Sequence, residues 1–340
     1  MYKVSVIIPT YNSERYIERT FNSLMNQSIG FENIEVIVVD DNSSDNTKTI
    51  LKNLELKYDN IKCFYYEDNS GSPSRGRNTG IDLASSNYLM FLDHDDVYDK
   101  FYCEKMVSTI EKFNVDIVLS TNSSINVNDL FELNSLNDDS FILVNPKENK
   151  SIFLEIFMWS KIFKTSFIRD YNIYCPITLH EDVVFCFKAY MNCDKLVYIK
   201  DYKGYDHVKR GANEDYSTGA FMSYNSLIKL IAGFREVFEY GQNHKKHLDW
   251  LMEEHMIHLC YYFAKANLTH DEKIKILEEI YDMQEEFGWY SLSEFFARII
   301  NDNIRKKNFK RTIFIGKVIK FLKSSDFLTK IYYILYGRPQ

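Results

Sequence analysis

The sequence shows no CxxC pair of cysteines, no evident signal-peptide pattern and no long apolar run. Its six cysteines form no CxxC pair, which favours buried free thiols in a reducing compartment over a disulfide framework. The chain enters an apolar segment at residue 4 with no charged leader or small-residue cleavage site, so no signal peptide is predicted and a cytoplasmic location is expected. No window approaches eighteen uninterrupted apolar residues, which excludes a membrane span but leaves surface attachment open.

The chain has enough length and aromatic content for a sizeable folded core. With 340 residues it can divide into two domains, and an aromatic content of 16% argues against disorder. The net charge of -7 is unevenly spread. Residues 304–340 carry ten Lys and Arg against one Asp, about +9, which leaves about -16 for the rest. This basic end on an acidic chain requires its own explanation.

Short apolar runs alternate with amphipathic segments over the first third of the chain. The runs at 4–9 and 34–40 are β-branched and nearly all apolar, as strands covered on both faces are. This alternation predicts an α/β fold with a mostly parallel sheet, whose ligand lies beyond the carboxyl ends of the strands. Further predicted strands are 61–66, 88–93, 115–121 and 141–144, and predicted helices are 13–27 and 43–58.

Two features set the predicted organisation of the remaining chain. The stretch SGSPSRGRNTG at 70–80 is predicted to be a loop that enters a helix at about Asn78. From about Thr218 onward the spacing of apolar residues is helical almost throughout. We therefore expect an α/β domain at 1–218 and a helical C-terminal module at 219–340.

The stretch YLMFLDHDDVYD crowds acidic side chains at the end of a predicted strand. Asp93, Asp95 and Asp96 repel one another unless a positive group neutralises them. A hard divalent cation, Mg²⁺ or Mn²⁺, suits a site built from one or two carboxylates and substrate phosphates. The alternative is that Asp96 or Asp99 caps the following helix.

A second acidic strand end follows residues 34–40. Asp41 can present an acceptor-only carboxylate to a base N–H, which is chemically suited to reading uracil. The alternative, a turn and helix N-cap, fits Ser44 or Asp45 but leaves Asp41 unexplained.

Two shorter motifs carry further candidates. PTYN places Tyr11 at a neighbouring strand end, where its ring can stack on a base or simply pack. LHEDVVF places Glu181 and Asp182 at a helix start, where acidic residues also complement the helix dipole.

Taken together, PTYN, VVDDNSSD, SRGRNTGI, FLDHDD and LHED resemble, in this order and spacing, the inverting family 2 glycosyltransferases. The matches span residues 3–218, and within the family they look most like bacterial enzymes that decorate wall teichoic acid or capsule. The resemblance implies a GT-A fold, a UDP-sugar donor, a divalent metal and transfer to an acceptor hydroxyl. An inverting transfer needs one general base and a group that stabilises the departing diphosphate.

The resemblance also implies roles for individual residues. Asp182 is the expected base with Glu181 beside it, and Asp95 and His207 are expected at the metal. Either Arg75 or Arg77 could be the functional arginine, and Arg77 is favoured because of the helix-start motif that follows it. The residues expected to bind the nucleotide sugar are Pro9, Tyr11, Asp41, Asn69, Arg77, Asp93 and Arg210.

The basic tail FKRTIFIGKVIKFLK interleaves lysines with apolar residues at helical spacing. It could lie on an anionic membrane surface, pack against the α/β domain, form an oligomer contact or steer a polyanionic acceptor. Nucleic acid is not an expected partner of this acidic chain.

The resulting hypothesis is a metal-dependent inverting transferase acting from a UDP-sugar on a hydroxyl of a bacterial surface glycan, polymer or glycoprotein. Its cytoplasmic location could include the inner face of the membrane. A sugar-phosphate nucleotidyltransferase is the rival enzyme, but it expects a glycine-rich loop where PTYN stands. A nucleotide-sugar or glycan-binding module without catalysis is the rival outside enzymes.

Overall fold

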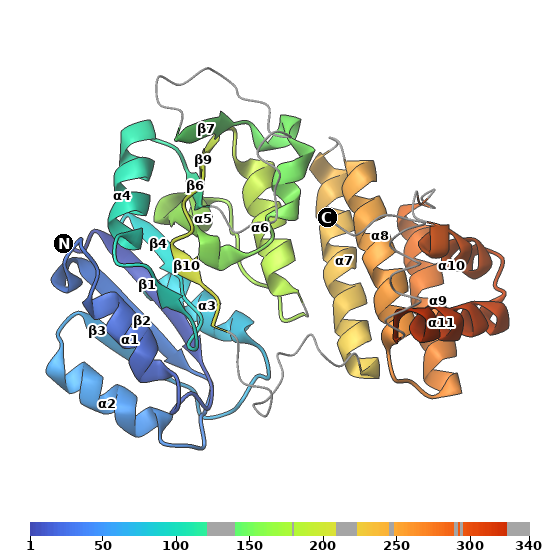
Figure 1. Ribbon diagram of the computed structural model, residues 1–340, viewed down its shortest axis with the longest axis horizontal. Coiled ribbons are helices and arrows are strands. Elements are labelled where there is room, and N and C mark those ends of the chain that lie inside the picture. Colours follow the sequence, from blue (N-terminus) through green and yellow to red (C-terminus); the bar gives the residue numbers. More distant parts are fainter. Residues whose placement is uncertain are drawn as a thin grey trace. The chain divides into compact units, whose positions relative to one another are not determined.

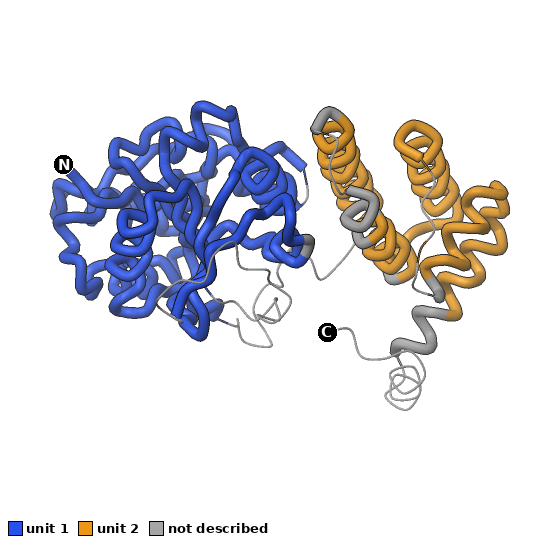
Figure 2. Tube along the Cα trace, turned by 90° about the horizontal axis from the view of Figure 1, so that it is seen from above, with its two compact units in different colours: residues 1–211 blue, residues 212–340 orange. Residues whose placement is uncertain are grey.

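The computed structural model describes residues 1–120, 140–178, 180–208, 223–244, 248–288, 292 and 295–324 (Figure 1). The contacts between residues divide the chain into two compact units, residues 1–211 and 212–340 (Figure 2). The predicted boundary at 218 lies outside the described residues. Within the described ranges, no helix combines the length and apolar character needed to cross a bilayer.

The first unit is built around a mixed sheet with strand order β3-β2-β1-β4-β8-β6-β9-β7. Strands β1 to β4 run parallel, β8 and β7 run antiparallel to their neighbours, and β6 and β9 pair in parallel. The mostly parallel sheet predicted from the sequence is therefore confirmed. The strands are β1 Val4–Thr10, β2 Ile34–Asp40, β3 Ile61–Tyr65, β4 Tyr88–Phe91, β6 Ile117–Ser120, β7 Phe141–Val144, β8 Lys161–Lys164 and β9 Leu196–Ile199, and a separate antiparallel pair is β5 Val97–Tyr98 with β10 Tyr205–Asp206.

Helices cover both faces of the sheet, which explains why β1 and β2 are buried along their whole length. Val6 and Ile8 of β1 face a cluster completed by α1, α2 and α4, whereas Ile7 faces a cluster completed by α3, α5 and α6. The helices are α1 Ile17–Met25, α2 Thr47–Lys57, α3 Pro73–Leu83, α4 Tyr102–Phe113, α5 Thr165–Asp170 and α6 Glu181–Asn192, with short 3-10 turns at Phe31–Asn33, Pro146–Glu148, Lys150–Leu154 and Met158–Ser160.

Helix α3 begins earlier than the sequence predicted. We expected helix from about Asn78, but α3 starts at Pro73. Ser72 is its N-cap and accepts a hydrogen bond from the Ser74 N–H at 3.3 Å, while proline at the first helical position suits the fixed φ of its ring. Two of the three glycines that indicated a loop, Gly76 and Gly80, thus lie inside a helix, and Gly71 precedes it.

Close packing explains those helical glycines. A Cβ added to Gly80 would lie 2.2 Å from Ile7 Cγ2, and one added to Gly76 would lie 3.0 Å from Pro9 Cβ. Helix α3 therefore lies directly against β1 because two of its positions carry no side chain. This close approach brings the α3 residues between Gly76 and Gly80 to the carboxyl ends of the strands.

The second unit contains only helices among its described residues, as the sequence predicted. Apolar side chains such as Phe234, Phe263 and Ile280 are buried in it. Thr269 starts one helix with a capping box, in which its side chain and that of Glu272 exchange hydrogen bonds with backbone N–H groups. The helices are α7 Tyr224–His244, α8 Leu248–Lys265, α9 His270–Phe287, α10 Phe295–Arg305 and α11 Phe309–Ser324.

Candidate active site

The carboxyl ends of β1, β2 and β4 bring the predicted nucleotide residues to one edge of the sheet. Thr10 pairs in register with Asp40, so Tyr11 and Asp41 follow neighbouring strands directly. The Tyr11 side chain is 44% exposed and available for stacking, whereas Pro9 is buried beneath α3. The exposed ring of Tyr11 is therefore accessible to a ligand, whereas Pro9 lies beneath the surface of the candidate site.

Asp41 is held by the segment that leads into α3. Both of its carboxylate oxygens accept hydrogen bonds: Oδ1 from Arg75 Nη2 at 2.5 Å, and Oδ2 from Ser70 N at 2.8 Å and Ser70 Oγ at 2.9 Å. Asn69 Nδ2 donates to the Asp41 carbonyl at 2.8 Å. The Arg75 guanidinium also stacks 3.7 Å above the Tyr66 ring. Sequence reasoning named Asp41 and Asn69, but missed Ser70 and Tyr66, which no local pattern marks.

Arg75 and Arg77 serve different parts of the site. Arg75 pairs with Asp41 and Asp68, whereas Arg77 is buried between two acids from distant segments. Arg77 Nη1 donates to Glu181 Oε1 at 2.5 Å, and Nη2 donates to Asp93 Oδ1 at 3.0 Å. Burial alone would lower the pKa of Arg77. The charges of Asp93 and Glu181 raise this pKa by more than burial lowers it, so the guanidinium stays charged.

Asp182 lies in the first turn of α6, next to this bridge. Its Oδ1 accepts a hydrogen bond from the Val183 N–H at 2.9 Å. Burial, followed by the charge of Glu181, raises the pKa of Asp182 to about 7, against an opposing contribution from Arg77. His180 precedes the helix in a left-handed conformation with φ of 61°. A carboxylate with this pKa can accept a proton near neutral pH.

The aspartates after β4 have separate environments. Asp96 is fully buried and does not cap a helix, contrary to one prediction, because β5 follows it. Its carboxylate accepts from Tyr205 Oη at 2.6 Å and Val208 N at 2.8 Å, and contacts His207 Nδ1 at 3.1 Å. The other capping candidate, Asp99, accepts from Phe101 N at 3.0 Å just before α4.

The metal ligands expected from the sequence are Asp95 and His207. Asp95 is 7% exposed and its carbonyl accepts from Arg19 Nη2 at 2.6 Å, while His207 is bonded to Asp96. No group of three or more His, Cys, Asp or Glu side chains among the described residues is arranged to hold a metal. The acidic oxygens of Asp93 and Asp95 nevertheless fit a hard cation that takes its other ligands from substrate phosphates and water. Arg210 lies outside the described residues.

The parallel β1–β4 layer with acidic strand ends is the architecture of the GT-A class of nucleotide-sugar-binding folds. A solved structure of Staphylococcus aureus TarS, residues 1–349 in complex with UDP-GlcNAc, superposes on this chain with a TM-score of 0.72. It is 23% identical and the match covers 94% of this chain and 92% of that one. The GT-A fold predicted from the sequence is confirmed.

Sequence comparison identifies the family. Residues 5–170 match the profile described as Glycosyl transferase family 2. This stretch of the chain is therefore a family 2 glycosyltransferase domain, as the motifs predicted.

The names of two curated relatives describe sugar transfer to poly(ribitol-phosphate). The poly(ribitol-phosphate) beta-N-acetylglucosaminyltransferase TarS of S. aureus is 31% identical over 68% of this chain and 40% of its own length. The poly(ribitol-phosphate) beta-glucosyltransferase of Bacillus spizizenii is 32% identical over 61% of this chain and 32% of its own length. The matched part of this chain thus spans two-fifths or less of each relative.

Proposed function

We propose that this protein is a metal-dependent inverting glycosyltransferase that transfers a hexose or N-acetylhexosamine from a UDP-sugar to a hydroxyl. The observation that carries the proposal is the bridge from Asp93 through Arg77 to Glu181, next to Asp182. It connects the donor side of the site, after β4, with a proton acceptor whose pKa is near neutrality.

The donor would occupy the edge formed by the ends of β1, β2 and β4. Tyr11 would stack on the uracil, and the segment from Asn69 to Arg75 would enclose the base beside Asp41. Because Arg75 and Ser70 already bind both Asp41 oxygens, the carboxylate is fixed in orientation before the donor arrives. This preorganisation lowers the entropy cost of binding.

The chemical step would be a single in-line displacement. Asp182 would remove the proton of the acceptor hydroxyl as its oxygen bonds to the anomeric carbon, and the bond from that carbon to the diphosphate oxygen would break, releasing UDP. Arg77 would position Glu181 and keep its charge balanced beside the base. A Mg²⁺ or Mn²⁺ ion held by Asp95, with Asp93 adjacent and His207 as a further candidate, would stabilise the charge of the departing diphosphate.

The acceptor class is proposed from the two polymer-modifying relatives. Their names give a ribitol-phosphate polymer as acceptor and N-acetylglucosamine or glucose as the sugar. We propose a hydroxyl of a phosphate-containing bacterial surface polymer as the acceptor here, with the reaction in the cytoplasm.

The test is UDP release across a panel of UDP-sugars with a ribitol-phosphate polymer as acceptor. At least one donor should turn over, EDTA should abolish turnover, and added Mn²⁺ or Mg²⁺ should restore it. Asp182→Asn should lower kcat by about a thousandfold, whereas exposed Asp170→Asn should not change it. Asp95→Ala should lose the response to metal.

Two results would reject the proposal. Full activity of Asp182→Asn would remove the assigned base. Thermal stabilisation by UDP without turnover of any donor, with metal and acceptor present, would favour a nucleotide-sugar-binding module instead.

A further inference from the structure

One face of α11 is packed and the opposite face is open. Thr312 and Ile313 are buried, and a Cβ added to Gly316 would lie 3.5 Å from Ala264 Cα, so this face lies closely against α8. On the other side Phe314 is 66% exposed and Val318 is 38% exposed. Residues 314 and 318 are one helical turn apart and therefore share a face.

Basic side chains border these two apolar residues. Lys310 and Lys317 lie one turn from Phe314 in either direction, and Arg311 is also exposed. A helix with exposed apolar residues among cations is suited to a surface that is apolar inside and negatively charged outside. We call Lys310, Phe314, Lys317 and Val318 the open face of α11.

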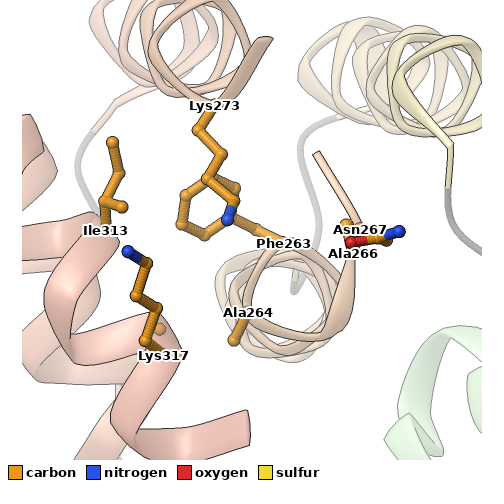
Figure 3. A pocket seen from close by; sticks show the side chains of 8 residues that line it. Phe263, Ala264, Ala266, Asn267, Lys273, Ile313 and Lys317 are labelled. Atoms are coloured by element: carbon orange, nitrogen blue, oxygen red, sulfur yellow. The ribbon is translucent and has the colours of Figure 1, made fainter. Parts of the chain in front are cut away.

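A pocket of about 130 Å³ lies beside this face (Figure 3). Its floor is apolar and includes Phe263, and the ammonium ends of Lys273 from α9 and Lys317 from α11 point into it. Asn267 adds an amide to the lining. The exposed Lys317 ammonium can bind an anion at this pocket, and a phosphate group is of suitable size. Lys317 belongs to the open face and also lines the pocket.

We propose that this part of the helical unit is a docking site for an anionic membrane surface. A lipid headgroup phosphate binds at the pocket beside Lys317, and Phe314 and Val318 insert at the level of the headgroups. The surplus of about nine positive charges over residues 304–340 strengthens the attraction to such a surface.

A lipid surface fits better than a phosphate polymer or a second copy of the chain. A soluble phosphate polymer satisfies the lysines but offers nothing apolar to the exposed phenyl ring of Phe314. A second copy would bring the same basic face against itself, and like charges repel. Only the membrane satisfies both parts of the site.

The experiment is co-sedimentation of the full chain with vesicles of phosphatidylcholine alone or mixed with phosphatidylglycerol. Binding should require phosphatidylglycerol and weaken with added salt. Phe314→Ser should lower the partition coefficient about tenfold, and Lys317→Gln should lower it about fivefold. Phe101→Ser and Lys229→Gln, exposed on α4's start and on α7, are matched controls that should bind as the parent chain does.

Competition and oligomer measurements separate the alternatives. Retained binding of Phe314→Ser together with displacement by soluble ribitol-phosphate polymer would overturn the proposal in favour of a polymer site. Concentration-dependent dimerisation lost in Phe314→Ser, without vesicle binding, would overturn it in favour of a second copy. UDP release with a soluble acceptor should be the same in all of these variants, so failure here is distinguishable from failure of the proposed transferase activity.

Discussion

At the scale of single residues, Arg77 organises the acidic site. It is buried and bonded to Asp93 and Glu181, so one guanidinium offsets carboxylates that arrive from two distant segments. The planar fork of arginine can reach both partners at once, whereas a lysine ammonium offers a single charge centre. In the proposed mechanism, Arg77 would therefore position the base and also contribute to the donor site.

Replacing Arg77 should disrupt stability and activity together. Arg77→Met leaves the partly buried carboxylates of Asp93 and Glu181 without this partner, and should cost about 3 kcal/mol of unfolding free energy and about a hundredfold in kcat/KM. Urea unfolding and UDP release measure the two effects. Exposed Arg15→Met is the control. Wild-type stability in Arg77→Met would show that the bridge is not needed.

Asp182 should give activity and stability opposite dependences on pH. Its pKa is raised from 3.8 to about 7, so kcat/KM should fall about tenfold per pH unit below 7. Its contribution to stability is fully present below pH 3.8 and is lost as the pH rises to about 7. Asp182→Asn should therefore unfold at a higher temperature than the parent at pH 8, measured by calorimetry. A flat pH–rate profile from pH 5 to 8 would contradict the assignment.

At the scale of elements, the close contact of α3 with β1 determines where Arg77 lies in the candidate site. Because Gly76 and Gly80 lack side chains, the helix approaches the strand and carries Arg77 to Asp93 after β4 and Glu181 at the start of α6. The strand ends alone would leave those acids without a buried cation.

Adding a methyl group should separate these elements. Gly80→Ala places a Cβ against the β-branched side chain of Ile7 and should lower the unfolding free energy by about 2 kcal/mol. The matched change Gly316→Ala meets only ordinary contacts in α11 and should be neutral or stabilise by up to about 1 kcal/mol. Equal effects in urea unfolding would show that helix propensity, not the close approach, decides the outcome.

At the scale of the whole molecule, the two units have separate cores. Both large apolar clusters of the sheet are made entirely of residues before 206, and the described helices from α7 onward bury their own side chains. The strand ends that form the candidate site all belong to the first unit.

Residues 1–211 should consequently fold alone. The fragment should show a cooperative thermal transition by circular dichroism and should be stabilised by UDP with Mn²⁺. A gradual transition with binding of an apolar dye would indicate that the first unit depends on the second.

The sequence predicted the sheet well because β1 and β2 are buried on both faces, and such runs are recognisable without tertiary information. It missed the start of α3 because Gly76 and Gly80 signal a loop unless their close packing is known. The division of labour between Arg75 and Arg77 depends on partners up to 104 residues away, which local spacing does not reveal.

The strand order also determines when the candidate site can assemble during translation. Strands β1 to β4 can pair as soon as they leave the ribosome, whereas both partners of β6 are synthesised after it. Arg77 likewise emerges long before Glu181 and Asp182. A nascent chain therefore completes the β1–β4 part of the candidate site early and gains Glu181 and Asp182 only when α6 has been translated.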